Sequence, residues 1–312
     1  MITAITIAIV LLGVFGGYAY CAVGAIAAGA TWWPYAAGLL LLPFAIPFAA
    51  SVAWFALAAW FGSPPPPDAR LDWRQRLALF WGEMCAIARS GPRMVLYRWL
   101  LPDPPPAPAA LPVLLLHGVL CNAGVWLGLR RHLRDRGLGP VYTLSYGPPL
   151  ASIELFAQQL AAKIDAILRD TGARQVALVG HSMGGLVARA YLRRFGADRV
   201  RLLMTLGTPH HGSVHAYLFP GASLAQLRPG NRWLATLNGD PLPPLRLVAL
   251  WSPHDSMVAP QSSARLDGAA EIVVRGVGHN ALLGDPAVYA AVERELIAAG
   301  VTPAAPTRAD AA

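Results

Sequence analysis

Charge is absent from the first fifth of the chain. No Asp, Glu, Lys, Arg or His occurs between Ile2 and Pro67, and Asp68 is the first charged side chain. The surface of a water-soluble domain carries such residues, so their absence excludes an ordinary soluble segment. A single helix over this run would be roughly 100 Å long, about three times the hydrocarbon thickness of a bilayer. The segment must therefore turn back on itself.

The turn is expected at residues 31–35, where a proline stands among Trp and Tyr side chains of the kind that favour a membrane interface. This predicts two spans, Ile5–Ala27 and Ala36–Phe61, and hence a transmembrane helical hairpin over residues 1–62. A signal peptide is less favoured, because it needs a basic start and polar sequence after a shorter apolar core. A single long span with a re-entrant piece is the third alternative.

Lysine and cysteine are also scarce. Lys163 is the only lysine, so the formal net charge of +8 comes almost wholly from arginine. The arginines are scattered and form no basic stripe with exposed aromatics, which argues against nucleic acid as a partner. The three cysteines, Cys21, Cys85 and Cys121, make no disulfide framework, although a bond between the last two stays open. We expect them to act as small buried hydrophobes.

Residues 63–110 connect the apolar segment to the rest of the chain. Within Leu71–Ile87, apolar residues recur at helical spacing, with Arg74, Arg76 and Glu83 assigned to the polar side. Two interpretations of this amphipathic helix stand level: it lies on the membrane surface, or it packs on the domain that follows. The proline-dense stretch Pro102–Pro112 predicts a semi-rigid spacer.

Residues 111–300 alternate short apolar strands with helices. The expected strands are Val113–Leu116, Val141–Ser145, Gln175–Val179, Val200–Leu206, Leu245–Trp251 and Glu271–Arg275, and the main helices are Trp126–Arg136, Ile153–Arg169, Met183–Arg194 and Ala287–Ala299. This alternation predicts an α/β domain with a mostly parallel, six-stranded sheet covered by helices on both faces. Residues 301–312 are expected to form a flexible tail.

A candidate nucleophile follows the third expected strand. The residues Gly180–Gly184 read Gly-His-Ser-Met-Gly, and glycine on both sides of Ser182 permits the tight strand-to-helix turn that exposes a serine hydroxyl. The helix that begins at Met183 points its positive dipole end at developing negative charge. The same pentapeptide can arise as a glycine-rich turn with an incidental serine, but its position between a strand and a helix favours catalysis.

The loop after the first expected strand supplies a candidate oxyanion hole. Acyl transfer needs backbone N–H groups that face the oxyanion, and Val119 and Met183 are the expected donors. His117 and His181 stand in the same two loops. We expect both histidines to brace these loops and to border the substrate, because neither lies where the catalytic base is expected.

The acid and base are sought after the last two expected strands, since the chain order serine, acid, histidine is typical of this arrangement. Asp255 follows one strand, and His279 follows the other in a glycine-rich loop. His279 would take the proton of Ser182 while Asp255 fixes its tautomer.

Other titratable residues near these strand ends compete for the same roles. Asp240 and Asp267 lie in glycine-containing loops, where aspartate usually caps or turns the chain. His254 precedes the expected base and is interpreted as a surface or supporting residue. His210 and His211 are expected in the pocket wall or at a helix entry, and His210 is a candidate substrate-binding residue.

With these residues assembled, Leu111–Gly300 resembles the bacterial lipase and esterase branch of the α/β-hydrolases. The shared motifs are the His-Gly-x loop 117–119, the Gly-x-Ser-x-Gly elbow 180–184, Gly-Thr-Pro-His-x-Gly at 207–212 and Gly-His at 278–279. The resemblance implies hydrolysis of carboxylic esters without a metal or another cofactor. The chain departs from the compact secreted lipases in its two-span anchor, and Val214–Pro244 is the expected place of a short cap.

The sequence thus predicts a membrane-anchored serine esterase or lipase that acts on lipids or other apolar esters through an acyl-enzyme. A thioesterase acting on acyl-protein or acyl-CoA, an acyltransferase and an inactive hydrolase-like membrane scaffold are the alternatives. Arg70, Arg74 and Arg76 follow the second span, so the positive-inside rule places the catalytic domain in the cytoplasm. The arginine-, alanine- and proline-rich composition suggests a bacterial inner membrane. The pattern leaves the oligomeric state and the acyl-chain length open.

Overall fold

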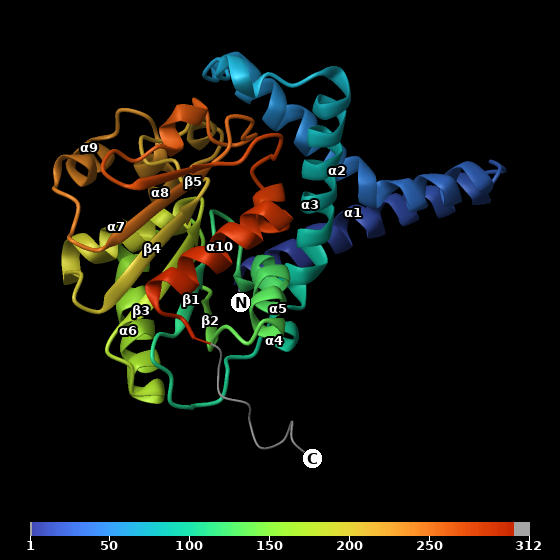
Figure 1. Ribbon diagram of the computed structural model, residues 1–312. Helices are drawn as coiled ribbons and strands as arrows, with labels where there is room; N and C mark the ends of the chain where they lie inside the picture. The colour runs from blue at the N-terminus through green and yellow to red at the C-terminus, as the bar shows by residue number, and fades with distance from the viewer. Residues whose placement is uncertain (1, 303–312) are drawn as a thin grey trace.

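The computed structural model describes residues 2–302 and shows an α/β domain with three long helices beside it (Figure 1). The sheet is wholly parallel, in the order β2-β1-β3-β4-β5-β6. Its strands are β1 Val113–Leu116, β2 Val141–Leu144, β3 Val176–His181, β4 Val200–Leu206, β5 Arg246–Trp251 and β6 Ala270–Val273. The predicted six-stranded α/β architecture is confirmed. The predicted tail, 301–312, lies almost wholly outside the described residues.

Each face of the sheet has its own hydrophobic core, because side chains alternate along a strand. Leu114 and Leu116 of β1 pack under α6 (Ile153–Thr171) and α7 (Met183–Phe195). Val113 and Leu115, which alternate with them along β1, face α5 (Leu127–Asp135) and α10 (Pro286–Ala299) on the other side of the sheet. Burial on both sides explains why these strands read as continuous apolar runs.

The parallel register brings the carboxyl ends of the strands to one edge. Leu116 pairs with Gly180, His181 pairs with Leu206, and Leu206 pairs with Leu250. The loops after β1, β3, β4 and β5 therefore open side by side, which is where parallel α/β sheets carry their ligand sites. Every candidate catalytic residue leaves the sheet at this edge or in the loop after β6.

The hairpin consists of α1 (Ile2–Ala27) and α2 (Trp33–Phe61), which lie side by side and project beyond the α/β domain (Figure 1). Both helices can cross a membrane by length and composition, with mean hydropathies of 2.1 and 2.0. Few of their residues are buried, and many large apolar side chains are exposed. Pro34 lies in the first turn of α2, where proline is tolerated, so α2 begins earlier than the sequence predicts.

Helix α3, Trp73–Val95, begins at the capping box of Asp72 and Gln75 and packs on the α/β domain. One face buries Glu83 and Met84, whereas Trp73, Leu77 and Trp81 are 69%, 50% and 47% exposed. The assignment of Glu83 to the polar side is therefore wrong. Its carboxylate is buried among hydrogen-bond donors of the α/β domain.

The remaining elements are short. They are η1 Pro67–Ala69, α4 Tyr97–Leu100, η2 Ala123–Trp126, η3 Val214–Tyr217, α8 Ala222–Leu227, α9 Arg232–Gly239, η4 Gln261–Ala264 and η5 Ala281–Leu283. Three of them, η3, α8 and α9, lie within the expected cap. The cysteines correct another expectation: all three are free thiols, Cys21 and Cys85 are exposed, and only Cys121 is partly buried.

Candidate active site

The nucleophile elbow is visible in the backbone of Ser182. This residue joins β3 to α7 with φ 55° and ψ −128°, a conformation that non-glycine residues rarely adopt and that is found at strained functional turns. A Cβ on Gly180 would lie 2.6 Å from the Gly185 nitrogen, and one on Gly184 would lie 2.3 Å from the Leu116 carbonyl oxygen. The motif therefore needs glycine at both places for steric reasons.

Two hydrogen bonds, one from a backbone amide and one from a side-chain hydroxyl, join the elbow to its neighbours. The Ser182 amide donates to the Leu206 carbonyl at 2.9 Å, and the Thr208 hydroxyl donates to the Ser182 carbonyl at 2.8 Å. The loop after β1 comes equally close, because a Cβ on Gly118 would lie 2.9 Å from the Ser182 Cβ. These contacts hold the serine against the candidate oxyanion loop.

The expected oxyanion donors lie on either side of Ser182. Met183 is the first residue of α7, so its amide has no acceptor within the helix. Within residues 2–302, neither this amide nor that of Val119 donates a hydrogen bond to the protein. Both residues line a cavity of about 10 Å³, which Thr3 of α1 closes in part, so the start of α1 reaches the candidate oxyanion loop. A space of this size holds one water molecule at most.

Asp255 and His279 form a buried acid–base pair. The distance from Asp255 Oδ2 to His279 Nδ1 is 2.8 Å, and the two side chains are only 1% and 4% exposed. The other carboxylate oxygen accepts the amides of Met257 and Val258 at 2.8 and 2.7 Å, which fixes its orientation. With Nδ1 donating to the carboxylate, His279 presents Nε2 as the basic nitrogen.

Burial disfavours the charged form of His279, but the charge and hydrogen bond of Asp255 and the charge of Glu83 outweigh it and raise the pKa of His279. The His279 ring lies 4.6 Å from the ring of His181, the residue before Ser182. A Cβ on Gly207 would lie 3.4 Å from His279 Nδ1, and Gly207 directly follows the residue that accepts the Ser182 amide. Serine, histidine and aspartate are thus gathered in one cluster.

The competing residues lie apart from this cluster. Asp240 forms an ion pair with Arg193 at 2.8 Å at the surface, and Asp267 is exposed. His254 lies at hydrogen-bond distance from the Ala69 carbonyl through Nε2 and accepts the Gly276 amide at Nδ1. Of the downstream acids singled out in the sequence, only Asp255 contacts His279.

The two histidines of the serine and oxyanion loops are buried. His117 stacks on Tyr146 with ring centroids 4.0 Å apart, and its Nδ1 lies 2.8 Å from the Gly118 carbonyl. His181 Nε2 lies 3.1 Å from the carbonyl of His279. Desolvation lowers the pKa of His117 to about 4 and that of His181 well below its usual value, so both rings are neutral and contact the loops on either side of the serine.

His210 is fully buried, with Nδ1 3.3 Å from Arg189 and Nε2 3.2 Å from the Thr205 hydroxyl. Both ring nitrogens face the protein, so this geometry supports a bracing role and offers no nitrogen to a substrate. Burial lowers the pKa of His210. Within residues 2–302, no group of three or more His, Cys, Asp or Glu side chains is placed to hold a metal ion.

Glu83 of α3 is the residue of the site that the sequence did not identify. Its Oε1 accepts the Ser256 hydroxyl at 2.6 Å and the Asn280 amide at 3.0 Å, and its Oε2 accepts the Ala281 amide at 3.0 Å. The Asn280 side chain adds a further donor at 2.8 Å. One carboxylate thus binds the residue after the acid and the residue after the base. A signal existed, because Glu83 shares a helical face with Phe80, Met84 and Ile87.

Comparison with known proteins shows which families and structures this chain is similar to. Residues 143–230 match the PGAP1-like α/β domain. The chain is 32% identical over 120 residues to triacylglycerol lipases of Pseudarthrobacter phenanthrenivorans and Burkholderia plantarii, covering 34% of this chain and 35% and 31% of those proteins. A segment of 41 residues is 56% identical to the GPI inositol-deacylase of Mus musculus, over 12% of this chain and 4% of that protein.

Solved structures agree on the fold. The mature lipase of Bacillus licheniformis superposes with a TM-score of 0.55 at 20% identity, covering 62% of this chain and 96% of that one. Lipase B of Aspergillus fumigatus gives 0.52 at 20% identity, over 60% and 52%. The described residues therefore share the fold of these lipases, an α/β-hydrolase fold. The chain spans about a third of the length of the triacylglycerol lipases that it matches.

Proposed function

We propose that this α/β-hydrolase is a membrane-anchored serine esterase or lipase that cleaves carboxylic esters of apolar acyl chains. The observation that carries the proposal is the strained backbone of Ser182, next to the buried pair of Asp255 and His279. A serine on a strained strand-to-helix turn beside an oriented histidine is an arrangement that activates a hydroxyl for attack on an acyl carbon. An incidental serine in a glycine-rich turn would need neither partner.

In the proposed reaction, the Ser182 hydroxyl oxygen attacks the ester carbonyl and passes its proton to His279 Nε2. Asp255 holds the ring and stabilises the imidazolium that forms. The Val119 and Met183 amides donate to the oxyanion. Collapse of the tetrahedral intermediate expels the alcohol, which takes the proton back from His279. Water then attacks the acyl-enzyme by the same path and releases the acid.

The substrate is proposed to arrive from a bilayer. Helices α1 and α2 expose apolar side chains over their projecting length, and the first turn of α1 reaches the oxyanion loop through Thr3. Arginines follow the second helix, which favours a bacterial inner membrane with the catalytic domain on the cytoplasmic side. An apolar ester in that membrane would meet the serine without crossing water.

The activity is tested with p-nitrophenyl esters of short and long acyl chains and with acyl-CoA thioesters. The wild-type chain should release p-nitrophenol and Ser182→Ala should not. Ser90→Ala, whose hydroxyl donates to the Ala86 carbonyl within α3, should match the wild type. Hydrolysis that survives in Ser182→Ala would overturn the proposal. Faster turnover of the thioester than of the matched ester would make the chain a thioesterase, and transfer of the acyl group to an added alcohol would make it an acyltransferase.

The anchor is tested separately by extracting membranes with alkaline carbonate. A chain held by two spans should stay in the membrane pellet, whereas release into the supernatant would contradict the proposal. A reporter fused after Ala312 that is active only in the cytoplasm should be active if the domain faces that side.

A further inference from the structure

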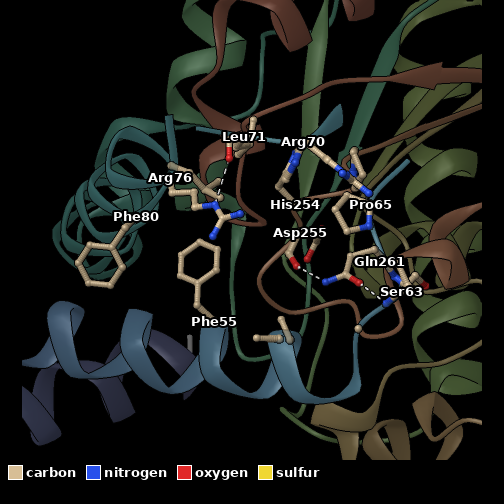
Figure 2. A pocket seen from close by; sticks show the side chains of 16 residues that line it. Phe55, Ser63, Pro65, Arg70, Leu71, Arg76, Phe80, His254, Asp255 and Gln261 are labelled. Carbon is tan, nitrogen blue, oxygen red and sulfur yellow. Dashed lines mark hydrogen bonds between the residues drawn. The ribbon is translucent and has the colours of Figure 1, made fainter. Parts of the chain in front are cut away.

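A cavity of about 570 Å³ lies where the hairpin, α3 and the catalytic domain meet (Figure 2). The end of α2 contributes Phe55, the start of α3 contributes Phe80, and the connector between the helices contributes Leu71. The inner wall is the loop that carries His254 and Asp255. Its volume is in the range of small-molecule sites, about 300–1,000 Å³.

The neutral polar groups of this cavity are already engaged by the protein. The Gln261 side chain accepts the Ser63 amide at 2.8 Å and donates to the Asp255 carbonyl at 3.2 Å. His254 uses both ring nitrogens, one near the Ala69 carbonyl and one for the Gly276 amide. A ligand in the cavity therefore contacts apolar side chains and the charged side chains that have no ionic partner.

Asp255 also lines the cavity, but its carboxylate is bonded to His279 and to two backbone amides, so the charge without an ionic partner is positive. Arg70 and Arg76 both line the cavity, and neither forms an ion pair within residues 2–302. Arg76 donates through Nε to the Leu71 carbonyl at 3.1 Å, and it lines the same cavity as Phe55 (Figure 2). The nearby carboxylate of Asp68 is paired with Arg275 instead. Two unpaired guanidinium groups beside apolar walls complement an anion with an apolar tail.

The position of the cavity indicates where such a ligand would come from. It begins at the last turns of α2, where the long apolar helix gives way to proline and charge. Trp73, Leu77 and Trp81 follow one another at four-residue spacing on the exposed side of α3, as expected for a helix at a membrane interface. The headgroups of a bilayer lie at this level if α2 spans it.

We infer that this cavity binds an anionic phospholipid, with the phosphate between Arg70 and Arg76 and part of an acyl chain against Phe55 and Phe80. The inference rests on the proposed membrane anchor and is independent of the chemistry at Ser182. Each basic residue near an anionic membrane surface adds about 1 kcal/mol of attraction, so removal of both should weaken binding roughly tenfold or more.

The test uses the full chain with Ser182→Ala, so that no probe is hydrolysed. It is reconstituted in nanodiscs of equimolar phosphatidylglycerol and phosphatidylcholine, and the lipids retained after gentle release are counted by native mass spectrometry. The parent should retain one phosphatidylglycerol in preference to phosphatidylcholine. Adding Arg70→Gln and Arg76→Gln should lower that preference at least about tenfold, whereas adding Arg131→Gln and Arg201→Gln, which remove two exposed arginines elsewhere, should leave it unchanged.

A second variant keeps both arginines. Ala59 lines the cavity from an exposed position on α2, so Ala59→Trp should fill the space and reduce retention of phosphatidylglycerol. Equal preference in the parent and in the Arg70/Arg76 variant would overturn the inference, as would retention of added oleate in place of phospholipid. Failure to enter the nanodisc would refute the anchor, and loss of ester hydrolysis in the wild type would concern Ser182 alone.

Discussion

The two halves of the candidate active site are held by different means. Ser182 and the oxyanion loop are held by backbone: a positive φ, glycines without room for a Cβ, and a hydrogen bond from the serine amide to β4. Asp255 and His279 are held by a side chain from far away in the sequence, because Glu83 of α3 bonds the residues that follow each of them. The half with Ser182, the nucleophile half, therefore depends on the backbone around the serine. The half with Asp255 and His279, the acid–base half, depends on α3, the helix that packs beside the hairpin.

This difference indicates how the helical hairpin and the candidate active site are connected. Ser256 and Asn280 meet on the Glu83 carboxylate, which accepts four hydrogen bonds from N–H or O–H donors. A displacement of α3 would move that carboxylate, while the elbow of Ser182 would keep its shape. Substitutions should therefore affect the two halves differently.

The largest effect is expected from removing the nucleophile. Ser182→Ala should lower kcat by about 10⁶, because loss of the attacking oxygen leaves only transition-state binding. Steady-state hydrolysis of a p-nitrophenyl ester measures this, with the melting temperature as a check on folding. A loss smaller than a hundredfold in a folded variant would remove Ser182 from its role.

The next largest effect concerns the orientation of the base. Asp255→Asn should lower kcat by about 10⁴, as in other serine hydrolases whose aspartate sets the tautomer of the histidine. Asp240→Asn is the matched control, because that carboxylate pairs with Arg193 at the surface. A loss below tenfold in Asp255→Asn, or a comparable loss in Asp240→Asn, would assign the acid elsewhere.

The nucleophile half should respond to volume. Gly118→Ala places a methyl group 2.9 Å from the Ser182 Cβ and 3.3 Å from its Oγ, so the serine must shift. A displacement of this kind should cost roughly a hundredfold in kcat with little change in the acid side of the pH profile. Gly91→Ala on α3, where nothing lies within 4 Å, is the control. Unchanged turnover in Gly118→Ala would place the loop further from the serine.

The acid–base half should respond to charge. Glu83→Gln should lower kcat roughly tenfold. The amide nitrogen of the glutamine would face N–H or O–H groups whose hydrogen bonds the carboxylate accepts, and it cannot accept them. The substitution should also move the pH profile: His279 must be neutral to act as base, so kcat/KM falls as the pH drops below its pKa. Glu83 helps to raise that pKa, so the acid limb of Glu83→Gln should shift to lower pH.

The control for charge is Glu293→Gln, which removes a carboxylate that pairs with Arg136 and His132 on another face. Its pH profile should match that of the wild type. A Glu83→Gln variant that loses activity without any shift of the acid limb would limit Glu83 to a structural role.

The sheet could be predicted from the sequence because its strands are short apolar runs between turn residues. Val113–Leu116 and Val200–Leu206 agree with the structure at both ends. The expected strand Glu271–Arg275 instead covers Ala270–Val273, and Gly276, with φ 71°, turns the chain soon after it. Local patterns fix the existence of a strand better than its last residue.

The residues of the candidate site differ in the same way: some are revealed by local sequence patterns, and others depend on packing. The elbow is recognisable because five consecutive residues carry its steric requirement, and Asp255 and His279 could be found from strand ends and chain order. The position of Glu83 on an apolar helix face indicates burial, but it does not reveal the hydrogen-bond partners of the carboxylate. Those partners are 173 to 198 residues away in the sequence. His210 fits a pocket wall by position in the sequence, but its contacts with Arg189 and Thr205 depend on packing.

The central claim, that Ser182 is the acyl-accepting nucleophile, is tested most directly by covalent labelling. The folded full chain is treated with a fluorophosphonate, and the intact mass and the labelled peptide are determined. The account predicts one adduct per chain, on the Ser182 oxygen, formed more slowly in Asp255→Asn and absent in Ser182→Ala. An adduct on another residue, or equal labelling of Ser182→Ala, would contradict it.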